Sequence, residues 1–435
     1  MNRSAGAALT RSAMCAYEGL HSRPDGPRRM NASETIAAIR ADARFAKATE
    51  TLAAEHGRTV QDVITLTEIP SPPFGEEQRA AAYLDMLKAH GLEDVEQDAI
   101  GNVMGIRRGY GNGEMLVVAA HLDTVFPAGT DVRVRRDGTK LFAPGVSDDT
   151  WSLAVNLAFL RALDAAGIRT RQDILFLGDV GEEGLGDLRG VRHFFEHSRY
   201  RPRVRHFLTV DSPQVEQIVS GGVGSRRYRV TFRGPGGHSY AAFGLVNPMY
   251  AMAEAARGLA AVEVPRNPPT THCVSVVSGG TSINAIANAV TIEVDLRSAS
   301  AAELEKLDKA FLAIVEKAVA TENTARSTQA GSIVAEIARV GDRPAGETPA
   351  GSPIRDIAAA AVTAEGYSPS FEFSSTDANV PMSLGIPALK VGAGGRGGRA
   401  HSLEEWLDVE PTECLRGMRS TLAAILALAG MEGVG

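Results

Sequence analysis

Short apolar runs alternate with longer amphipathic stretches along most of the chain. The apolar runs predict buried strands at 115–120, 173–177, 206–210 and 388–391. The stretches between them predict helices, and the helix at 151–166 has one apolar stripe, formed by Leu153, Leu157, Leu160 and Leu163. Strands that alternate with helices indicate the α/β fold class, with a three-layer, mostly parallel sheet.

The pattern changes after Asp211, where strands of alternating polarity begin. We expect helices at 247–259 and from Ser300, whose Ser-x-x-Glu sequence is typical of a capping box. Around them we expect strands at 226–233, 271–277, 289–297 and 332–340. The order βαββαβ predicts an inserted, ferredoxin-like α+β domain.

These patterns divide the chain into three parts. The α/β domain is expected to be discontinuous, at 31–221 and 344–435, because the insert at 222–343 splits it. Residues 1–30 contain several arginines but no continuous apolar segment, so we expect a disordered extension and no secretory signal. A cytoplasmic location is the corresponding expectation.

The composition excludes several classes of partner. The chain has 435 residues and a formal net charge of −7, so we expect it to bind neither nucleic acid nor an anionic membrane surface. No window approaches the roughly 18 apolar residues that a membrane-spanning helix needs. The three cysteines are too few and too scattered for a disulfide framework or a cysteine-based zinc site.

Two imidazoles and three carboxylates stand at the ends of predicted strands or in glycine-rich loops: His121, Asp148, Glu183, Asp211 and His401. In an open parallel sheet, the carboxyl ends of the strands form the ligand-binding edge. Mixed nitrogen and oxygen ligands suit a pair of divalent ions, and we expect two Zn²⁺, with Co²⁺ or Mn²⁺ as alternatives. Asp148 is the candidate bridging ligand because it lies on a tight turn, in the middle of the order.

Two further acids flank these residues. Asp123 lies two residues after His121, on the same side of an extended chain, so its carboxylate is predicted to accept the second imidazole N–H. Glu182 precedes Glu183 and is predicted to act as general base on a water shared by the two ions. The alternative for Asp123 is a strand-end acid in solvent, and the alternative for Glu182 is simple charge balance. The convergence of all five ligands favours a di-metal hydrolase.

Six short motifs occur in the order of a known family: HLDTV (121–125), GVSDD (145–149), GEEG (181–184), Asp211, GGHS (236–239) and His401. Together they resemble the co-catalytic zinc exopeptidase family, which includes peptidase T, glutamate carboxypeptidase, aminoacylase and succinyl-diaminopimelate desuccinylase. The resemblance extends from about residue 31 to the C-terminus. The stretches TDAN (376–379) and GDRPAG (341–346) favour the peptidase T-like branch.

The resemblance implies a distribution of the ligands between the two ions. One zinc ion is implied to bind His121, Asp148 and Asp211. The other is implied to bind Asp148, Glu183 and His401, so that Asp148 bridges the pair. The same resemblance implies a cis peptide bond after Asp148.

The insert is implied to be the dimerisation or lid domain of the family. His238 matches a histidine that, in relatives, reaches the active site of the partner subunit, so we expect a homodimer. Asn284 and Arg297 match positions that contact the substrate or its carboxylate, for which the fork of an arginine is well suited. An edge-strand charge is the alternative interpretation of Arg297. Asp377 matches a residue that lines the substrate pocket.

Asp123 and Glu182 match the acid that orients the first histidine and the general base of the family. We therefore predict a di-zinc metallopeptidase that hydrolyses a peptide bond of small peptides near a free carboxylate terminus. The first alternative is an amidohydrolase that acts on N-acyl or N-carbamoyl amino acids. A catalytically inactive homologue that binds metal or ligand, and a structural oligomerisation module, are more remote alternatives. No predicted ligand or base is missing from the sequence.

Overall fold

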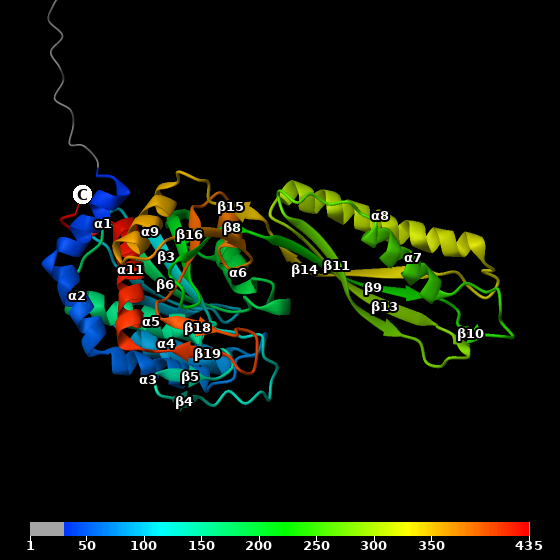
Figure 1. The fold of residues 1–435 in the computed structure, drawn as a ribbon, viewed down its shortest axis with the longest axis horizontal. Coiled ribbons are helices and arrows are strands. Elements are labelled where there is room, and N and C mark those ends of the chain that lie inside the picture. Colours follow the sequence, from blue (N-terminus) through cyan, green and yellow to red (C-terminus); the bar gives the residue numbers. More distant parts are fainter. Residues whose placement is uncertain (1–29, 435) are drawn as a thin grey trace, which may run out of the picture.

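The computed structural model describes residues 30–434, which form two bodies connected by two chain crossings (Figure 1). The predicted extension at 1–30 lies outside the described residues, apart from Met30. The larger body contains the first and last parts of the chain. The insert extends from its side as an elongated arm (Figure 1).

A nine-stranded sheet forms the centre of the larger body. Its strands are β1 (Glu93–Gln97), β2 (Val103–Arg107), β3 (Met115–His121), β6 (Asp173–Asp179), β7 (Val204–Val210), β8 (Gln217–Gly222), β15 (Gly346–Glu347), β16 (Ser370–Ser374) and β17 (Ala388–Val391). Their order is β1-β2-β6-β3-β7-β17-β8-β15, with β16 paired to β8. The central strands β6, β3, β7 and β17 are parallel, and antiparallel pairs flank them on both sides. The predicted α/β fold class is confirmed.

Helices cover both faces of this sheet and complete the three layers (Figure 1). One face is covered by α1 (Ala32–Ala41), α2 (Ala43–Ala54), α3 (His56–Thr67), α4 (Glu77–Lys88), α5 (Thr150–Ala165), α9 (Pro353–Ala364) and α11 (Pro411–Ala429). The other face is covered by α6 (Arg189–His197) and α10 (Asn379–Ser383). Two 3₁₀ turns, η1 (Gly184–Gly186) and η2 (Arg201–Arg203), complete this body. Among the helices of residues 30–434, none combines the length and apolar character that a membrane crossing requires.

Strand β3 shows why the central strands are continuous apolar runs in the sequence. Leu116 and Val118 belong to the core on the α5 side of the sheet, whereas Val117 and Ala119 belong to the core on the α6 side. Successive side chains of a strand point to opposite faces, and both faces are covered here. The strand can therefore have no polar position until it reaches His121 at its carboxyl end.

The insert follows the predicted order βαββαβ. Its antiparallel sheet has the order β11-β13-β9-β14, from β9 (Gly224–Arg233), β11 (Thr270–Gly279), β13 (Ala289–Ser298) and β14 (Val334–Arg343). Helices α7 (Pro248–Ala260) and α8 (Ala301–Ala325) pack on this sheet around a separate core. The short strands β10 (Gly237–His238) and β12 (Ala285–Ile286) pair at the end of the arm that lies far from the larger body (Figure 1).

A small four-stranded sheet in the larger body was not predicted. It has the order β18-β19-β5-β4, from β4 (Arg135–Asp137), β5 (Lys140–Phe142), β18 (Arg396–Gly398) and β19 (Trp406–Asp408). Strands of three residues are too short to leave a periodic signal in the sequence. The turn between β18 and β19 carries His401, whose φ angle of 63° is left-handed. Because β19 pairs with β5, this turn lies near the loop that follows β5.

Candidate metal centre

The structure brings the five predicted ligands to one cavity of about 540 Å³ at the carboxyl edge of the large sheet, lined in part by His121, Asp148, Glu183, Asp211 and His401. His121 is the last residue of β3, and Asp211 directly follows β7. Glu183 lies in the loop after β6, and Asp148 lies directly before the start of α5. Three different loops and two strand ends therefore supply one site.

Asp148 stands between the two imidazoles. Its Oδ1 lies 2.9 Å from Nε2 of His121, and its Oδ2 lies 3.2 Å from Nε2 of His401. Nε2 of His401 also lies 2.8 Å from Oε1 of Glu183. Ligand atoms of His121, Asp148 and Glu183 all lie within 4.8 Å of one another. A carboxylate with one oxygen at each imidazole is placed as a bridging ligand would be.

The electrostatics of this group agree with a cation site. Hydrogen bonds with Asp148 and Glu183 raise the pKa of His401 to about 10. Burial alone would raise the pKa of Asp148, but its hydrogen bonds with the two imidazoles lower it below the ordinary value. The carboxylates of Asp148 and Glu183 therefore stabilise positive charge next to their oxygens, where the imidazole nitrogens now lie. Facing imidazole nitrogens and carboxylate oxygens are the donor set that zinc and similar divalent ions prefer, so these residues fit a metal pair.

Asp211 lines the same cavity but does not belong to the close group of ligand atoms. Burial raises the pKa of Asp211, and the ammonium of Lys390 acts against this rise. Lys390 lies on β17, lines the cavity, and donates a hydrogen bond of 2.5 Å to Oγ of Ser212. Lys390 was not predicted as a site residue, because a lysine within a short apolar strand does not indicate in the sequence that its side chain lines a cavity.

Asp123 is fully buried and supports two parts of the site. Its two carboxylate oxygens accept backbone N–H groups of Glu182 and Glu183, each at 2.9 Å. Nδ1 of His121 lies 3.0 Å from the carbonyl oxygen of Asp123 and 3.6 Å from its Oδ1. The nearer partner of the imidazole is therefore the backbone carbonyl and not the carboxylate that the sequence predicted. The carboxylate is instead occupied by the two amides.

Glu182 is buried beside the predicted ligands and lines the cavity. Burial raises its pKa to about 8, and the guanidinium of Arg343 acts against that rise. Nη1 of Arg343 lies 3.2 Å from Oε1 of Glu182, and Nη2 donates to the carbonyl oxygen of the same residue. Arg343 belongs to the GDRPAG stretch, whose sequence indicated the family branch but did not predict this contact.

Glu405 holds the loop that presents Asp148. Its carboxylate accepts the backbone N–H groups of Gly145 at 2.8 Å, Ser147 at 2.8 Å and Asp148 at 3.0 Å, and also the hydroxyl of Ser147. The Asp148–Asp149 peptide bond in this loop is cis, as the resemblance implies. Glu405 was not predicted as a site residue, and its position four residues after His401 is the signal in the sequence that points to it.

The predicted substrate residues are dispersed. Arg297 lines the cavity from β13 and pairs with Asp295 at 2.6 Å. Asp377 is only 1% exposed and, unlike its neighbours Ser375 and Thr376, does not line the cavity, in contrast to the position that the resemblance implies.

The remaining two predicted substrate residues lie on the insert. His238 and Asn284 are exposed at the β10–β12 end of the insert, far from this cavity (Figure 1). Within one chain they therefore cannot contribute to the site.

Residues 117–427 match the family model described as peptidase family M20/M25/M40. The chain belongs to this family. Among curated M20 relatives, a succinyl-diaminopimelate desuccinylase of Leptothrix cholodnii is 27% identical over 278 residues, which are 59% of this chain and 72% of the relative. A succinyl-diaminopimelate desuccinylase of Corynebacterium glutamicum is 28% identical over 175 residues, which are 40% of this chain and 46% of the relative. The chain spans less than half the length of two of the curated relatives that it matches.

Solved M20 structures share the fold. The aminopeptidase PepT from Bacillus cereus superposes with a TM-score of 0.69 at 22% identity, covering 86% of this chain and 99% of that one. The dipeptidase Dug1p from Saccharomyces cerevisiae has a TM-score of 0.68 at 14% identity, over 88% and 98% of the two chains. A hydantoinase/carbamoylase family amidase from Burkholderia ambifaria has a TM-score of 0.57 at 18% identity, over 88% and 98%. Membership of this peptidase family supports a hydrolase, and the likeness to the solved structures supports the fold.

Proposed function

We propose that this chain is a di-zinc exopeptidase that hydrolyses a peptide bond in small peptides with a free carboxylate terminus. The observation that carries this proposal is the position of Asp148 between the two imidazoles, with buried Glu182 in the same cavity. The likeness of the fold to an aminopeptidase and a dipeptidase supports a peptide substrate.

The residues of the cavity suit a pair of metal ions. His121, Asp148 and Asp211 would hold one ion, and Asp148, Glu183 and His401 would hold the other. When bound, such ions polarise a carbonyl group and lower the pKa of a water from 15.7 towards about 7. Zinc is the metal we propose, because Zn²⁺ readily binds imidazole nitrogens and carboxylate oxygens in the same site.

Glu182 is the proposed general base. Its carboxylate would accept a proton from the attacking water and return it to the nitrogen of the leaving amine. Burial raises the pKa of Glu182 and the guanidinium of Arg343 acts against this rise, so the side chain can both accept a proton and release it. Asp123 fixes the backbone of Glu182, and Arg343 contacts its carboxylate.

The insert supplies the proposed substrate contacts. Arg297 would bind the terminal carboxylate of the substrate, because its guanidinium lines the cavity on the side of the insert. His238 would act in a homodimer by entering the cavity of the partner subunit, where it would stabilise the developing oxyanion.

An amidohydrolase that acts on N-acyl or N-carbamoyl amino acids is the second candidate. It is favoured by the sequence matches, since both relatives named above are succinyl-diaminopimelate desuccinylases. A free carboxylate next to the scissile bond is common to both candidates, so Arg297 does not distinguish them.

A substrate panel on the zinc-loaded protein tests the proposal. We expect turnover of di- or tripeptides, loss of turnover after chelation, and its return when Zn²⁺ is added. Preferential hydrolysis of N-acetyl, N-succinyl or N-carbamoyl amino acids would replace the peptidase with the amidohydrolase. No hydrolysis of any member by protein that holds two ions would overturn the proposal and favour an inactive homologue.

A further inference from the structure

The last strand of the insert ends at a residue that contacts the proposed base. Arg343, the final residue of β14, is 4% exposed. Its Nη1 lies 3.2 Å from Oε1 of Glu182 and 3.0 Å from Oγ of Ser375. Its Nη2 donates to the carbonyl oxygen of Glu182. One guanidinium therefore holds both the backbone and the side chain of the same glutamate.

The rest of the loop that carries Glu182 is also bonded to the insert. We call residues 181–188 the base loop. Nη1 of Arg227, on β9, donates to the carbonyl oxygen of Gly184 at 2.8 Å. The backbone N–H of Asp342, on β14, lies 3.1 Å and 3.0 Å from the two carboxylate oxygens of Asp187. Both strands at which the insert begins and ends thus hold the base loop.

The two chain crossings between the bodies are themselves fixed. Nδ2 of Asn379 donates to the carbonyl oxygens of Val223 and Pro344, each at 2.9 Å, and these two residues belong to the two crossings. Asn379 is fully buried, and its Oδ1 accepts the backbone N–H of Thr376 at 3.0 Å. A Cβ atom on Gly222 would come within 2.7 Å of this side chain. The junction therefore leaves the crossings little freedom.

We propose that Arg343 is a positioning residue for Glu182. We also propose that Asn379, which binds both chain crossings, makes the position of Glu182 depend on how the insert is placed against the larger body. The inference rests on the proposed function, in which Glu182 is the base. Arginine suits this role because its planar fork can hold two oxygens in a fixed relation. Arg343 also lines the cavity, but its Nη1 contacts Glu182 and Ser375 and its Nη2 donates to Glu182, so its guanidinium is directed at the base.

The test compares variants of Arg343 in the full-length, zinc-loaded enzyme on its best panel substrate. Arg343→Met removes the charge at similar length, and we expect kcat to fall about 10²-fold with KM little changed, as expected for a base displaced by about 1 Å. Arg343→Lys keeps the charge without the fork and should recover part of kcat. Asn379→Ala should lower kcat in the same way but less, because Arg343 itself remains.

Arg229→Met is the matched control. Arg229 also lies in the insert sheet, where its Nε pairs with Glu293 at 2.8 Å, and it does not line the cavity. This variant should keep the kcat and KM of the parent enzyme. All variants should bind two metal ions per chain, measured by elemental analysis.

Two results would overturn the inference. One is unchanged kcat in Arg343→Met, and the other is a rise in KM alone, which would make Arg343 a substrate contact. If Arg343→Met does not fold, Arg343→Lys decides by the same split between kcat and KM. These results leave the proposed function intact, because that function is tested separately, by the substrate panel on the parent enzyme and by Glu182→Gln.

Discussion

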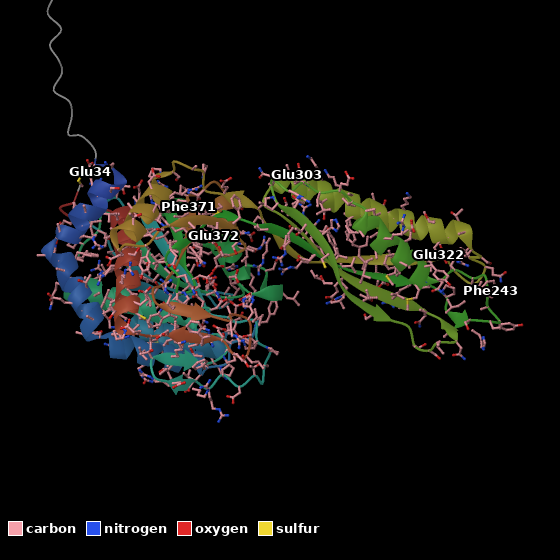
Figure 2. All side chains as sticks on the ribbon, viewed as in Figure 1. Glu34, Phe243, Glu303, Glu322, Phe371 and Glu372 are labelled. Carbon is pink, nitrogen blue, oxygen red and sulfur yellow. The ribbon has the colours of Figure 1, made fainter. Side chains whose placement is uncertain are left out.

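The four-stranded sheet of the insert extends from an end near the larger body to an end far from it, and the two ends of the insert differ in what covers them. At the end near the larger body, Arg343 is buried and bonded to the base loop. At the far end, Tyr240, Phe243 and Ile283 are 88%, 85% and 103% exposed, and Phe243 projects from the tip of the arm (Figure 2). A gathering of exposed apolar side chains at one place is typical of an association surface. The near end has its partners within the chain, whereas these side chains of the far end are exposed in the part of the chain that the structure describes.

The two ends of the insert would therefore contribute to a catalytic site in two different ways. The near end acts in cis, through bonds to Glu182 that are present in a single subunit. The far end carries His238, which reaches a cavity only if another subunit brings one to it. Variants of the two ends test this division, and Glu182, which the near end contacts, is the first residue to change.

The largest effect is expected from Glu182→Gln. The amide keeps the shape of the side chain but cannot accept the proton of the attacking water, so kcat should fall about 10³-fold. The metal content should stay at that of the parent protein, because Glu182 is not a predicted ligand. Steady-state kinetics together with elemental analysis measure both. Full turnover by a variant that holds two ions would remove the role of Glu182.

Loss of the far end should have the next largest effect. His238→Ala should lower kcat about 10²-fold, because it would remove one donor to the developing oxyanion. Steady-state kinetics measure the fall, and sedimentation should show a dimer before and after the change. A monomer of the parent protein at micromolar concentration that is fully active would contradict a role in trans.

Mixing two inactive variants distinguishes trans from cis directly. In a dimer of one Glu182→Gln and one His238→Ala subunit, one of the two sites has both groups intact if the histidine acts in trans. Random re-association of equal amounts should therefore recover about a quarter of the parent activity. No recovery after subunit exchange would place His238 outside the catalytic site of the partner.

Arg297, at the near end of the insert, should give a smaller effect of another kind. Arg297→Met should raise KM about tenfold for substrates with a free terminal carboxylate, which corresponds to the loss of one charged hydrogen bond. Substrates in which that carboxylate is amidated should show little change between the parent and the variant. Equal changes for both kinds of substrate would favour a structural role of its pair with Asp295.

The smallest effect is expected on thermal stability, from the buried acids Asp179 and Asp377. Asp179 and Asp377 are buried together, and as two carboxylates neither has a hydrogen-bond donor among the described residues. Burial raises the pKa of Asp179 to about 7, and burial with the charge of Asp179 raises that of Asp377. A shared proton would satisfy both groups.

The sign of the pH dependence follows from these raised values. Between about pH 4 and pH 7 the folded state holds a proton that the unfolded state releases, so stability falls as the pH rises through this range. Asp377→Asn supplies a permanent N–H donor to Asp179, and its melting temperature should fall less between pH 5 and pH 8 than that of the parent protein. Equal falls in thermal unfolding experiments would show that the pair does not share a proton.

Much of the fold could be predicted from the sequence because its signals are local. The apolar runs marked the central strands, and the capping box at Ser300 marked the start of α8, where the hydroxyl of Ser300 accepts the N–H of Glu303. His121 and Asp211 were recognisable since each ends a strand that is buried on both faces. In contrast, the strands β18 and β19 are three residues long, and they pair with each other and, through β19, with the distant strand β5.

The sequence by itself determined the α/β class, the order of the elements, and the set of imidazoles and acids at the carboxyl ends of the strands. These follow from periodicity and motif, which depend on neighbours along the chain. Only the tertiary structure decided that Glu405 holds the Asp148 loop, that Arg343 holds Glu182, and that Asn379 fixes both crossings. Each of these contacts joins residues that are distant in the sequence, and a buried polar group shows its partner only when the chain has folded around it.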